Sequence, residues 1–269
     1  MTIDVALPRV TRFSIGRVLR DTFGIFGRNI LLFGGAAIIA RLLLLFAPAS
    51  VVPDPEGSTD WVAYCVTSGL DIVVWGLSEA AITFATFQCL RGRRANAGDI
   101  AHGMRSAVPI VLAGTIYSLP LYAVTVIEVV FAGQDLLAGI LTLVAAIVAI
   151  ALTLMWWVYV PAIAIEGKGV FASLGRSVQL TKGRRWAIVG IYVLLIIAVV
   201  GPMIPIAIVT GWSPASALSA SPFTLLGAVG FVFFAISTAL YTVLVTVAYF
   251  HLRMEKEGAG AEDIVRVFD

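Results

Sequence analysis

Charged residues are scarce in this sequence. Only 13% of its 269 residues are Asp, Glu, Lys or Arg, whereas 60% are hydrophobic. Soluble domains average roughly 25% charged residues. A soluble chain of this length cannot bury so much apolar surface, because a small globular protein exposes a large share of its surface to water. The composition therefore excludes an ordinary soluble domain and favours a membrane protein.

Cysteine is rare as well. The two cysteines, Cys65 and Cys89, fall in one hydrophobic run. In a helix that rises about 1.5 Å per residue they would lie roughly 36 Å apart. A disulfide requires α-carbons within about 7 Å of each other, so we expect both thiols to be free.

Motifs that carry catalytic chemistry are missing. The sequence contains no HExxH, GxSxG or P-loop motif, which would indicate a metalloprotease, a serine hydrolase or a nucleotide-binding protein. His102 and His251 lie near the predicted membrane boundary, so no histidine base lies deep in a span beside an intramembrane nucleophile. We therefore expect no catalytic residue, no metal site and no cofactor, and we predict that the protein is not an enzyme.

What the sequence does contain is long hydrophobic runs. A helix needs about 20 apolar residues to cross a hydrocarbon core of roughly 30 Å, and continuous apolarity favours helices over the alternating strands of a barrel. We predict an all-α integral membrane bundle of six transmembrane helices. The predicted spans are residues 30–52, 61–90, 107–131, 136–165, 186–209 and 223–251. They belong to one helical membrane domain at 1–254, followed by a short C-terminal tail at 255–269.

The basic residues are unevenly distributed between the two ends of these spans. Seventeen of the 18 Lys and Arg residues lie before the first span, after the last span, or in the second and fourth connections. The other three connections contain no Lys or Arg, although together they hold Asp54, Glu56, Asp60 and Asp135. Short loops rich in Lys and Arg stay on the cytoplasmic side. We therefore predict that both termini and the basic connections face the cytoplasm.

Three segments that precede predicted outward spans are amphipathic. Residues 14–29 place apolar side chains on one helical side, residues 170–180 repeat this pattern, and residues 99–105 form a shorter version. Helices of this kind lie in the headgroup plane of a bilayer. We infer three units, each an interfacial helix followed by two spans. The alternative is that basic connections tend to be amphipathic in any membrane protein.

Two ionisable residues fall deep inside predicted spans. Counting residues places Arg41 roughly 20 Å above Arg28, and Glu79 roughly 18 Å above Arg91. Charges within spans are costly and are usually paired, so we predict an Arg41–Glu79 ion pair. The pair would either fix the register of two helices or line a cavity in which Arg41 binds an anionic group.

Basic residues that flank the spans are expected to attract anionic lipids. Those predicted to face lipid headgroups are Arg17, Arg20, Arg28, Arg93, Arg94, Arg176, Lys182, Arg184 and Arg185. As partners we expect membrane lipids, anionic lipids in particular, together with a partner membrane protein or self-association. No nucleic acid is expected.

Two stretches resemble a known family. Residues 155–166 have the sequence MWWVYVPAIAIE, and residues 169–186 have the sequence GVFASLGRSVQLTKGRRW. They are similar to the pattern P-x-I-x-x-E … G-x-x-x-S-L-x-R-S-x-x-L-T-x-G-x-x-W of bacterial proteins that resemble the glycerophosphoryl diester phosphodiesterase membrane domain. The segment FSIGRVLRDTFGIFGRN at 13–29 resembles that family's N-terminal pattern. The resemblance implies a helical membrane domain in a bacterial cytoplasmic (inner) membrane, and no phosphodiesterase residue carries over.

These observations favour a non-catalytic function. The chain is predicted to be a scaffold, an accessory subunit or a lipid-interacting regulator. The alternative is a carrier or small channel for a lipid-like or amphipathic substrate. A continuous polar cavity that reaches Arg41 and Glu79 would favour transport, whereas a solid bundle would favour a structural role.

Overall fold

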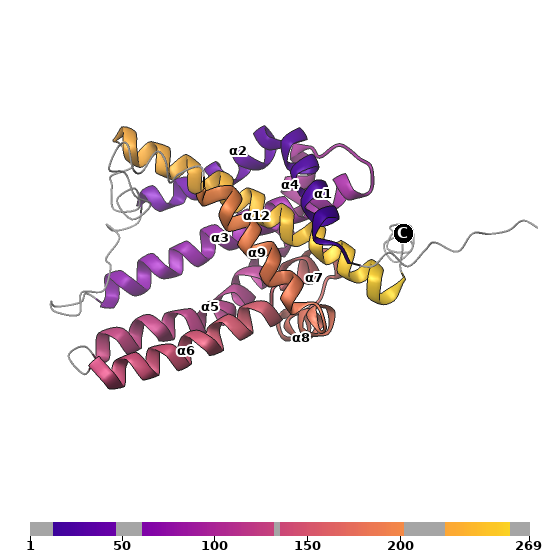
Figure 1. Ribbon diagram of the computed structural model, residues 1–269. Coiled ribbons are helices and arrows are strands. Elements are labelled where there is room, and N and C mark those ends of the chain that lie inside the picture. Colours follow the sequence, from indigo (N-terminus) through magenta and orange to yellow (C-terminus); the bar gives the residue numbers. More distant parts are fainter. Residues whose placement is uncertain (1–12, 47–60, 132–134, 202–223, 259–269) are drawn as a thin grey trace, which may run out of the picture.

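The computed structural model describes residues 13–46, 61–131, 135–201 and 224–258. Across these ranges the chain is helical and contains no strand (Figure 1), which confirms the predicted all-α membrane bundle. The helices are α1 (Ile15–Arg28), α2 (Ile30–Arg41), η1 (Leu42–Phe46), α3 (Trp61–Leu90), α4 (Ala97–Gly103), η2 (Met104–Ser106), α5 (Ala107–Val130), α6 (Asp135–Met155), α7 (Tyr159–Glu166), α8 (Val170–Thr181), α9 (Arg185–Val200) and α12 (Leu225–Glu257).

Among the described residues, four helices are long and apolar enough to cross a membrane, and there are up to six spans if each of two bent helix pairs counts as one. The predicted span 61–90 coincides with α3. The described part of the first span ends with η1 at Phe46, and that of the fifth ends with α9 at Val200. The predicted ends at 47–52 and 202–209 lie outside the described residues. α12 runs to Glu257, so residues 255–257 of the predicted tail are helical.

α3 and α12 form the centre of the bundle. They pack against each other, and each also contacts α2 and α7. Phe33 of α2, Ile82 of α3 and Leu244 of α12 are fully buried in one shared core. α5 and α6 are peripheral and expose apolar side chains such as Leu112 and Leu143. Such a surface suits contact with lipid, since large exposed apolar patches are rare on soluble monomers.

Two glycines allow close approach to α3. At Gly103 an added Cβ would collide with the main-chain oxygen of Ala80, and at Gly76 it would lie 2.7 Å from Cγ2 of Val111. Small residues at such points let the backbones of membrane helices approach closely. These contacts fix α4 and α5 against α3.

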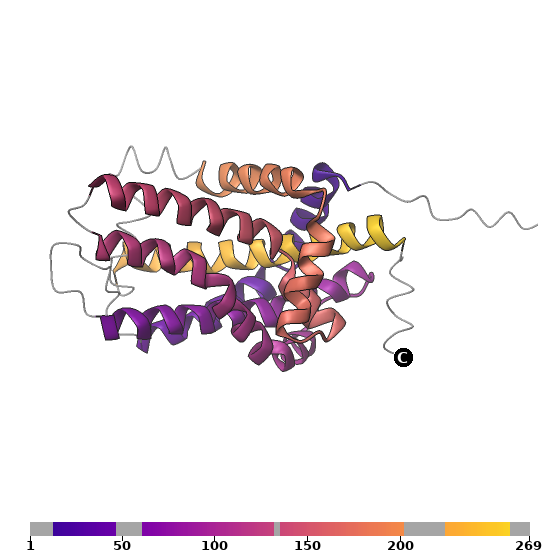
Figure 2. The ribbon, with the colours of Figure 1, turned by 90° about the horizontal axis from the view of Figure 1, so that it is seen from below.

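Basic connections gather at one end of the bundle. α1, α4, α7, α8 and the C-terminal end of α12 lie there, whereas the N-terminal ends of α3 and α12 lie at the other end (Figures 1 and 2). We call the first of these the basic end. The basic connections thus lie together at one end of the bundle, as the uneven distribution of Lys and Arg in the sequence predicts.

The first and last amphipathic segments meet their spans at sharp bends. α1 and α2 are bent by 81°, and α8 and α9 by 95°. Val18, Thr22 and Phe26 form the buried face of α1. The middle segment differs, because α4, η2 and α5 together form one 34-residue candidate span. The middle unit therefore lacks the sharp bend of the other two, and α4 packs there against α3 at Gly103; the threefold repeat stays a prediction.

The predicted span 136–165 is confirmed as one candidate span, Leu136–Glu166, although its helix has a local break. α6 ends at Met155 and α7 begins at Tyr159. Pro161 explains the break, because a proline ring clashes with the carbonyl four residues earlier and offers no N–H. The main-chain groups freed by the break bond to α8: Val158 N–H donates to Ser177 Oγ at 3.0 Å, and Ser177 Oγ donates to Met155 O at 3.0 Å.

Candidate functional site: a tyrosine-lined cavity

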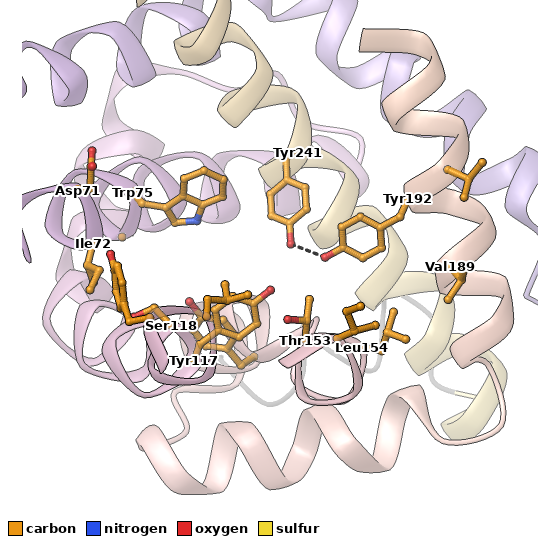
Figure 3. Close-up of a pocket in the computed structure, with 17 residues that line it drawn as sticks. Asp71, Ile72, Trp75, Tyr117, Ser118, Thr153, Leu154, Val189, Tyr192 and Tyr241 are labelled. Atoms are coloured by element: carbon orange, nitrogen blue, oxygen red, sulfur yellow. Dashed lines mark hydrogen bonds between the residues drawn. The ribbon is translucent and has the colours of Figure 1, made fainter. Parts of the chain in front are cut away.

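A half-enclosed cavity of about 640 Å³ lies between α3, α5, α6, α7, α9 and α12. Most of its wall is apolar, and its polar side chains are Asp71, Ser118, Thr153 and five tyrosines (Figure 3). Binding sites for small molecules commonly have volumes of about 300–1,000 Å³ and apolar walls with a few polar groups. We call it the tyrosine cavity. Its aromatic lining consists of Trp75, Tyr117, Tyr122, Tyr159, Tyr192 and Tyr241.

The tyrosines come from different helices and contact one another. The hydroxyls of Tyr192 on α9 and Tyr241 on α12 are 2.9 Å apart and share a hydrogen bond. The rings of Tyr117 on α5 and Tyr159 on α7 have centroids 5.5 Å apart, and those of Trp75 and Tyr241 are 5.7 Å apart. Aromatic pairs at these separations attract each other. The cavity wall is therefore held together by contacts between helices that are far apart in sequence.

Glu79 lies behind this wall. Its side chain is only 3% exposed and lies beside Trp75 and Tyr159, two residues that line the cavity. Its Oε2 has no hydrogen-bond partner within the described residues. A buried polar atom without a partner is costly, so this carboxyl adds an unsatisfied acceptor next to an otherwise apolar space.

Arg41 occupies a different place. It lines a smaller cavity of about 220 Å³ together with Asp71, Trp75 and Ser78. Its guanidinium carbon lies 5.8 Å from the ring centroid of Phe231 and 5.5 Å from that of Phe234, within the range of cation–π attraction. Asp71 is the acidic residue that acts on Arg41 electrostatically.

The predicted Arg41–Glu79 ion pair is wrong, since the structure contains no ion pair between them. Counting residues predicts the correct depth, because Arg41 shares its cavity with Ser78, the neighbour of Glu79. It does not predict the direction in which a side chain points around α3. Each residue turns a helix by about 100°, so Asp71 and Ser78, seven residues apart, share one face, whereas Glu79 points toward α7.

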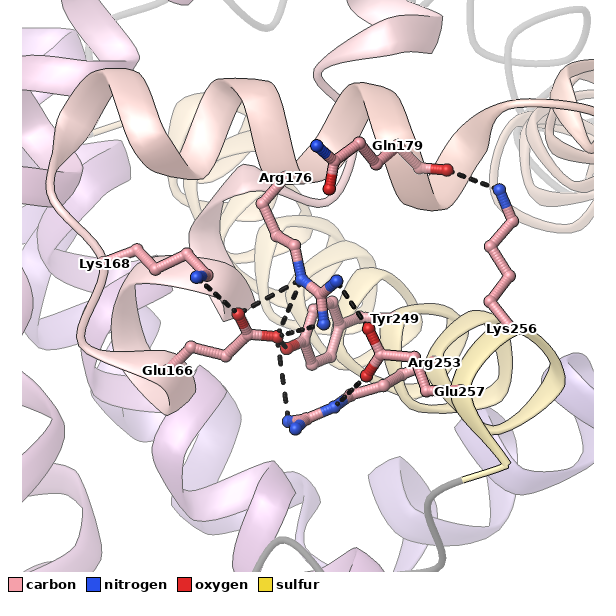
Figure 4. Close-up of polar contacts among 8 residues, drawn as sticks. All are labelled: Glu166, Lys168, Arg176, Gln179, Tyr249, Arg253, Lys256 and Glu257. Atoms are coloured by element: carbon pink, nitrogen blue, oxygen red, sulfur yellow. Dashed lines mark hydrogen bonds and ion pairs between the residues drawn. The ribbon is translucent and has the colours of Figure 1, made fainter. Parts of the chain in front are cut away.

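A cluster of charges joins α7, α8 and α12 at the basic end (Figure 4). Glu166 accepts hydrogen bonds from Arg176 and from the hydroxyl of Tyr249. Lys168 and Arg253 lie 3.5 Å and 3.7 Å from its carboxylate oxygens. Arg176 and Arg253 both pair with Glu257 as well. The residues of the sequence pattern around 161–186 thus contact one another and have a structural role.

The predicted headgroup-facing residues fall into distinct groups. Arg176 and Arg184 face acidic side chains of α12 rather than lipid; the hydrogen bond and charge of Glu255 raise the pKa of Arg184 above its ordinary value. Arg28, Arg93 and Arg94 share a second large cavity at the basic end. Of the remaining four, Arg20, Lys182 and Arg185 are exposed, and Arg17 is partly exposed.

Sequence reasoning missed the tyrosine cavity. Its signal was present, because Tyr117, Tyr159, Tyr192 and Tyr241 fall in four separate hydrophobic runs. Only the packing of the helices shows that they converge. Across the described residues no group of three or more His, Cys, Asp or Glu side chains could hold a metal ion.

Comparison with known proteins identifies the family but no relative of known activity. A family model described as a domain of unknown function, DUF7847, matches residues 13–252. No curated protein and no solved structure matches the chain. The family match carries no link to the glycerophosphoryl diester phosphodiesterase membrane domain, so that resemblance stays a prediction. The matched region covers well over half of the chain, and the chain therefore belongs to the DUF7847 family.

Proposed function

We propose that this protein is a non-catalytic, lipid-interacting membrane protein that holds a lipid-like, amphipathic molecule in the tyrosine cavity. The observation that carries the proposal is the cavity itself: about 640 Å³ of half-enclosed, mainly apolar space inside a bundle of membrane helices. An acyl chain suits the apolar wall, and the tyrosine hydroxyls suit an ester or hydroxyl group near its polar end. A regulator or accessory subunit that senses lipid would need a site of this kind.

The hydroxyls in the cavity support binding more than catalysis. Ser118 Oγ donates to Thr115 O of its own helix at 3.0 Å, and the hydroxyls of Tyr192 and Tyr241 bond to each other. A catalytic nucleophile needs a base within hydrogen-bond reach. The bonds formed by these three hydroxyls fix the shape of the wall instead.

A carrier for a lipid-like substrate is the second candidate. The observation in its favour is that Asp71 and Trp75 line both the tyrosine cavity and the smaller Arg41 cavity. A ligand headgroup could therefore move from one cavity to the other past Trp75, which is 42% exposed. Transport of fluorescent lipid between the leaflets of reconstituted vesicles would favour this candidate over a static binding protein.

The proposal includes a location and an orientation. The protein resides in a bacterial cytoplasmic membrane with its basic end and both termini in the cytoplasm, following the positive-inside rule. In that orientation the Glu79 side of the cavity lies nearer the inner leaflet, because Glu79 is closer than Asp71 to the basic end of α3.

A photoreactive phospholipid tests the proposal directly. The protein would be reconstituted with a phospholipid that carries a diazirine on one acyl chain, irradiated and digested. Crosslinks are expected to be enriched on peptides that contain Tyr117, Tyr192 or Tyr241. An even distribution over the exposed faces of α5 and α6 would contradict an occupied cavity.

A matched pair of variants on α9 sharpens this test. Val193 lines the cavity, whereas the adjacent Leu194 does not, and their exposed fractions are similar at 49% and 43%. Val193→Trp is expected to fill part of the cavity and to reduce crosslinking to it. Leu194→Trp adds the same bulk on another face and should leave crosslinking unchanged. Equal effects of the two variants would argue against a specific site.

A further inference from the structure

Three arginines line a second cavity at the basic end, separate from the tyrosine cavity. Arg28, Arg93 and Arg94 surround a space of about 700 Å³, together with Ile25, Asn29, Cys89 and Gly92. Arg28 ends α1, whereas Arg93 and Arg94 follow α3. We call this space the arginine pocket.

Local structure holds the two sides of the pocket together. The Asn29 side chain lies at the α1–α2 bend and donates to Ile25 O at 2.9 Å and to Cys89 Sγ at 3.6 Å. On the other side Gly92 has a φ of +78°, a left-handed conformation that favours glycine. That turn lets Arg93 N–H donate to Gln88 O at 3.0 Å. These hydrogen bonds and the turn at Gly92 therefore fix the backbone positions of the arginines.

Within the part of the chain that the structure describes, no ion pair neutralises the positive charge of the pocket. Among the described residues, no carboxylate lies within ion-pair distance of Arg28, Arg93 or Arg94, whereas Arg176 and Arg184 at the same end are both paired. Asp99 is the nearby acidic residue. Its carboxylate accepts a hydrogen bond from Asn96 N–H at 2.9 Å as part of the N-terminal cap of α4. Guanidinium groups bind phosphate oxygens through paired hydrogen bonds, so three unpaired arginines favour a phosphate group.

Apolar side chains beside the pocket indicate where that phosphate comes from. Phe23 on α1 is 46% exposed, and Ile30 and Leu31 at the start of α2 are 43% and 89% exposed. Such residues beside a basic cluster are typical of a helix at the headgroup level of a bilayer. We propose that the arginine pocket binds the phosphate of an anionic phospholipid headgroup whose acyl chains lie against Phe23, Ile30 and Leu31.

Native mass spectrometry with defined lipids tests this assignment. The protein, released from detergent, would be titrated with phosphatidylglycerol and, in parallel, with phosphatidylcholine. Wild-type protein is expected to retain one phosphatidylglycerol in preference to phosphatidylcholine. Each Arg→Gln change at 93 or 94 should weaken binding about fivefold, the effect of one basic residue near an anionic membrane surface. The double variant Arg20→Gln, Arg185→Gln removes two positive charges, more than either single pocket variant, from exposed positions outside the pocket and should change binding little.

Cys89 provides a second measurement that does not depend on the variants. Its thiol lines the arginine pocket, whereas the exposed Cys65 lies at the other end of α3. Phosphatidylglycerol vesicles are expected to slow maleimide modification of Cys89 relative to phosphatidylcholine vesicles, with Cys65 as the internal reference. The proposal is overturned if the control double variant loses as much binding as the pocket variants. It is also overturned if inorganic phosphate alone protects Cys89 as well as the lipid does.

Discussion

Arg176 donates three hydrogen bonds to Glu166, from Nε to both carboxylate oxygens at 3.1 Å and from Nη2 to Oε1 at 2.9 Å. Glu166 lies on α7 and Arg176 ten positions later on α8, and their side chains are 10% and 16% exposed, respectively. This pair closes the α7–α8 turn, and Tyr249 and Arg253 extend it to α12.

Glu166→Gln should destabilise the protein. The change leaves Arg176 and Arg253 with an uncharged partner in a partly buried place, where a charged hydrogen bond contributes about 1.5–3 kcal/mol. The midpoint of thermal unfolding in detergent is expected to fall. Lys168→Gln is the control, because Lys168 is 38% exposed and surface ion pairs contribute about 0–1 kcal/mol. Equal midpoints for the two variants would contradict the structural role of Glu166.

Ser177→Ala should weaken the break between α6 and α7. The change removes the acceptor of Val158 N–H and one donor to Met155 O, and an unsatisfied buried group costs about 1–3 kcal/mol. Ser173→Ala is the matched control on α8: Ser173 is equally buried, but it donates only to Val170 O in its own helix. Protease sensitivity of α6–α7 in detergent should rise for Ser177→Ala alone. A similar rise for both would show that the break does not depend on Ser177.

Two double-mutant cycles can test whether Arg41 interacts with Asp71 rather than with Glu79. Residues in contact usually show coupling energies of about 0.5–3 kcal/mol, whereas distant residues are additive within about 0.5 kcal/mol. Arg41→Gln combined with Asp71→Asn is expected to be non-additive in unfolding measurements. Arg41→Gln combined with Glu79→Gln should be additive. The opposite result would restore the Arg41–Glu79 pair predicted from the sequence.

Gly103→Ala should be strongly unfavourable. Its Cβ would collide with the main-chain oxygen of Ala80, which cannot rotate away as a side chain can, and overpacking of this kind costs about 1–3 kcal/mol. Gly139→Ala in α6 is the control, because no atom lies within 4 Å of its added Cβ. That change should be neutral or slightly stabilising, since alanine favours helix. The amount of folded protein after size-exclusion chromatography distinguishes the two variants.

The sequence predicted the helices better than the contacts between them. Hydrophobic length identified α3 with its full bounds, because the thickness of the bilayer sets the length of a span. It did not identify the break at residues 156–158, although Pro161 marks the position, because a proline in a membrane helix does not by itself show whether the helix kinks or breaks. The groups that stabilise the break, on Ser177 and Thr181, come from α8.

The residues of the candidate site could not be brought together by counting residues along the helices. Counting gives depth along a helix but not the direction in which a side chain points. Counting therefore predicts the depth of Arg41 correctly but pairs it with Glu79, whereas Arg41 lies on the Asp71 side of α3. The tyrosine cavity required the packing of six helices, and its residues carry no motif. Glu166 and Arg176, by contrast, belong to the sequence pattern that resembles a known family. The pattern does not predict that the two residues pair.

The contacts made by the end of α12 have a consequence for biosynthesis. Glu255 and Glu257 pair with Arg184 and Arg176, and the Lys256 ammonium donates to main-chain oxygens at 179 and 182. α8 is therefore completed by α12, a helix that leaves the ribosome after it. Until then the arginines of α8 and of the turn after it have no α12 carboxylates to bind. The arrival of α12 therefore completes these contacts, and a chain shortened before Glu255 would leave Arg184 without its carboxylate partner and exposed to quality control.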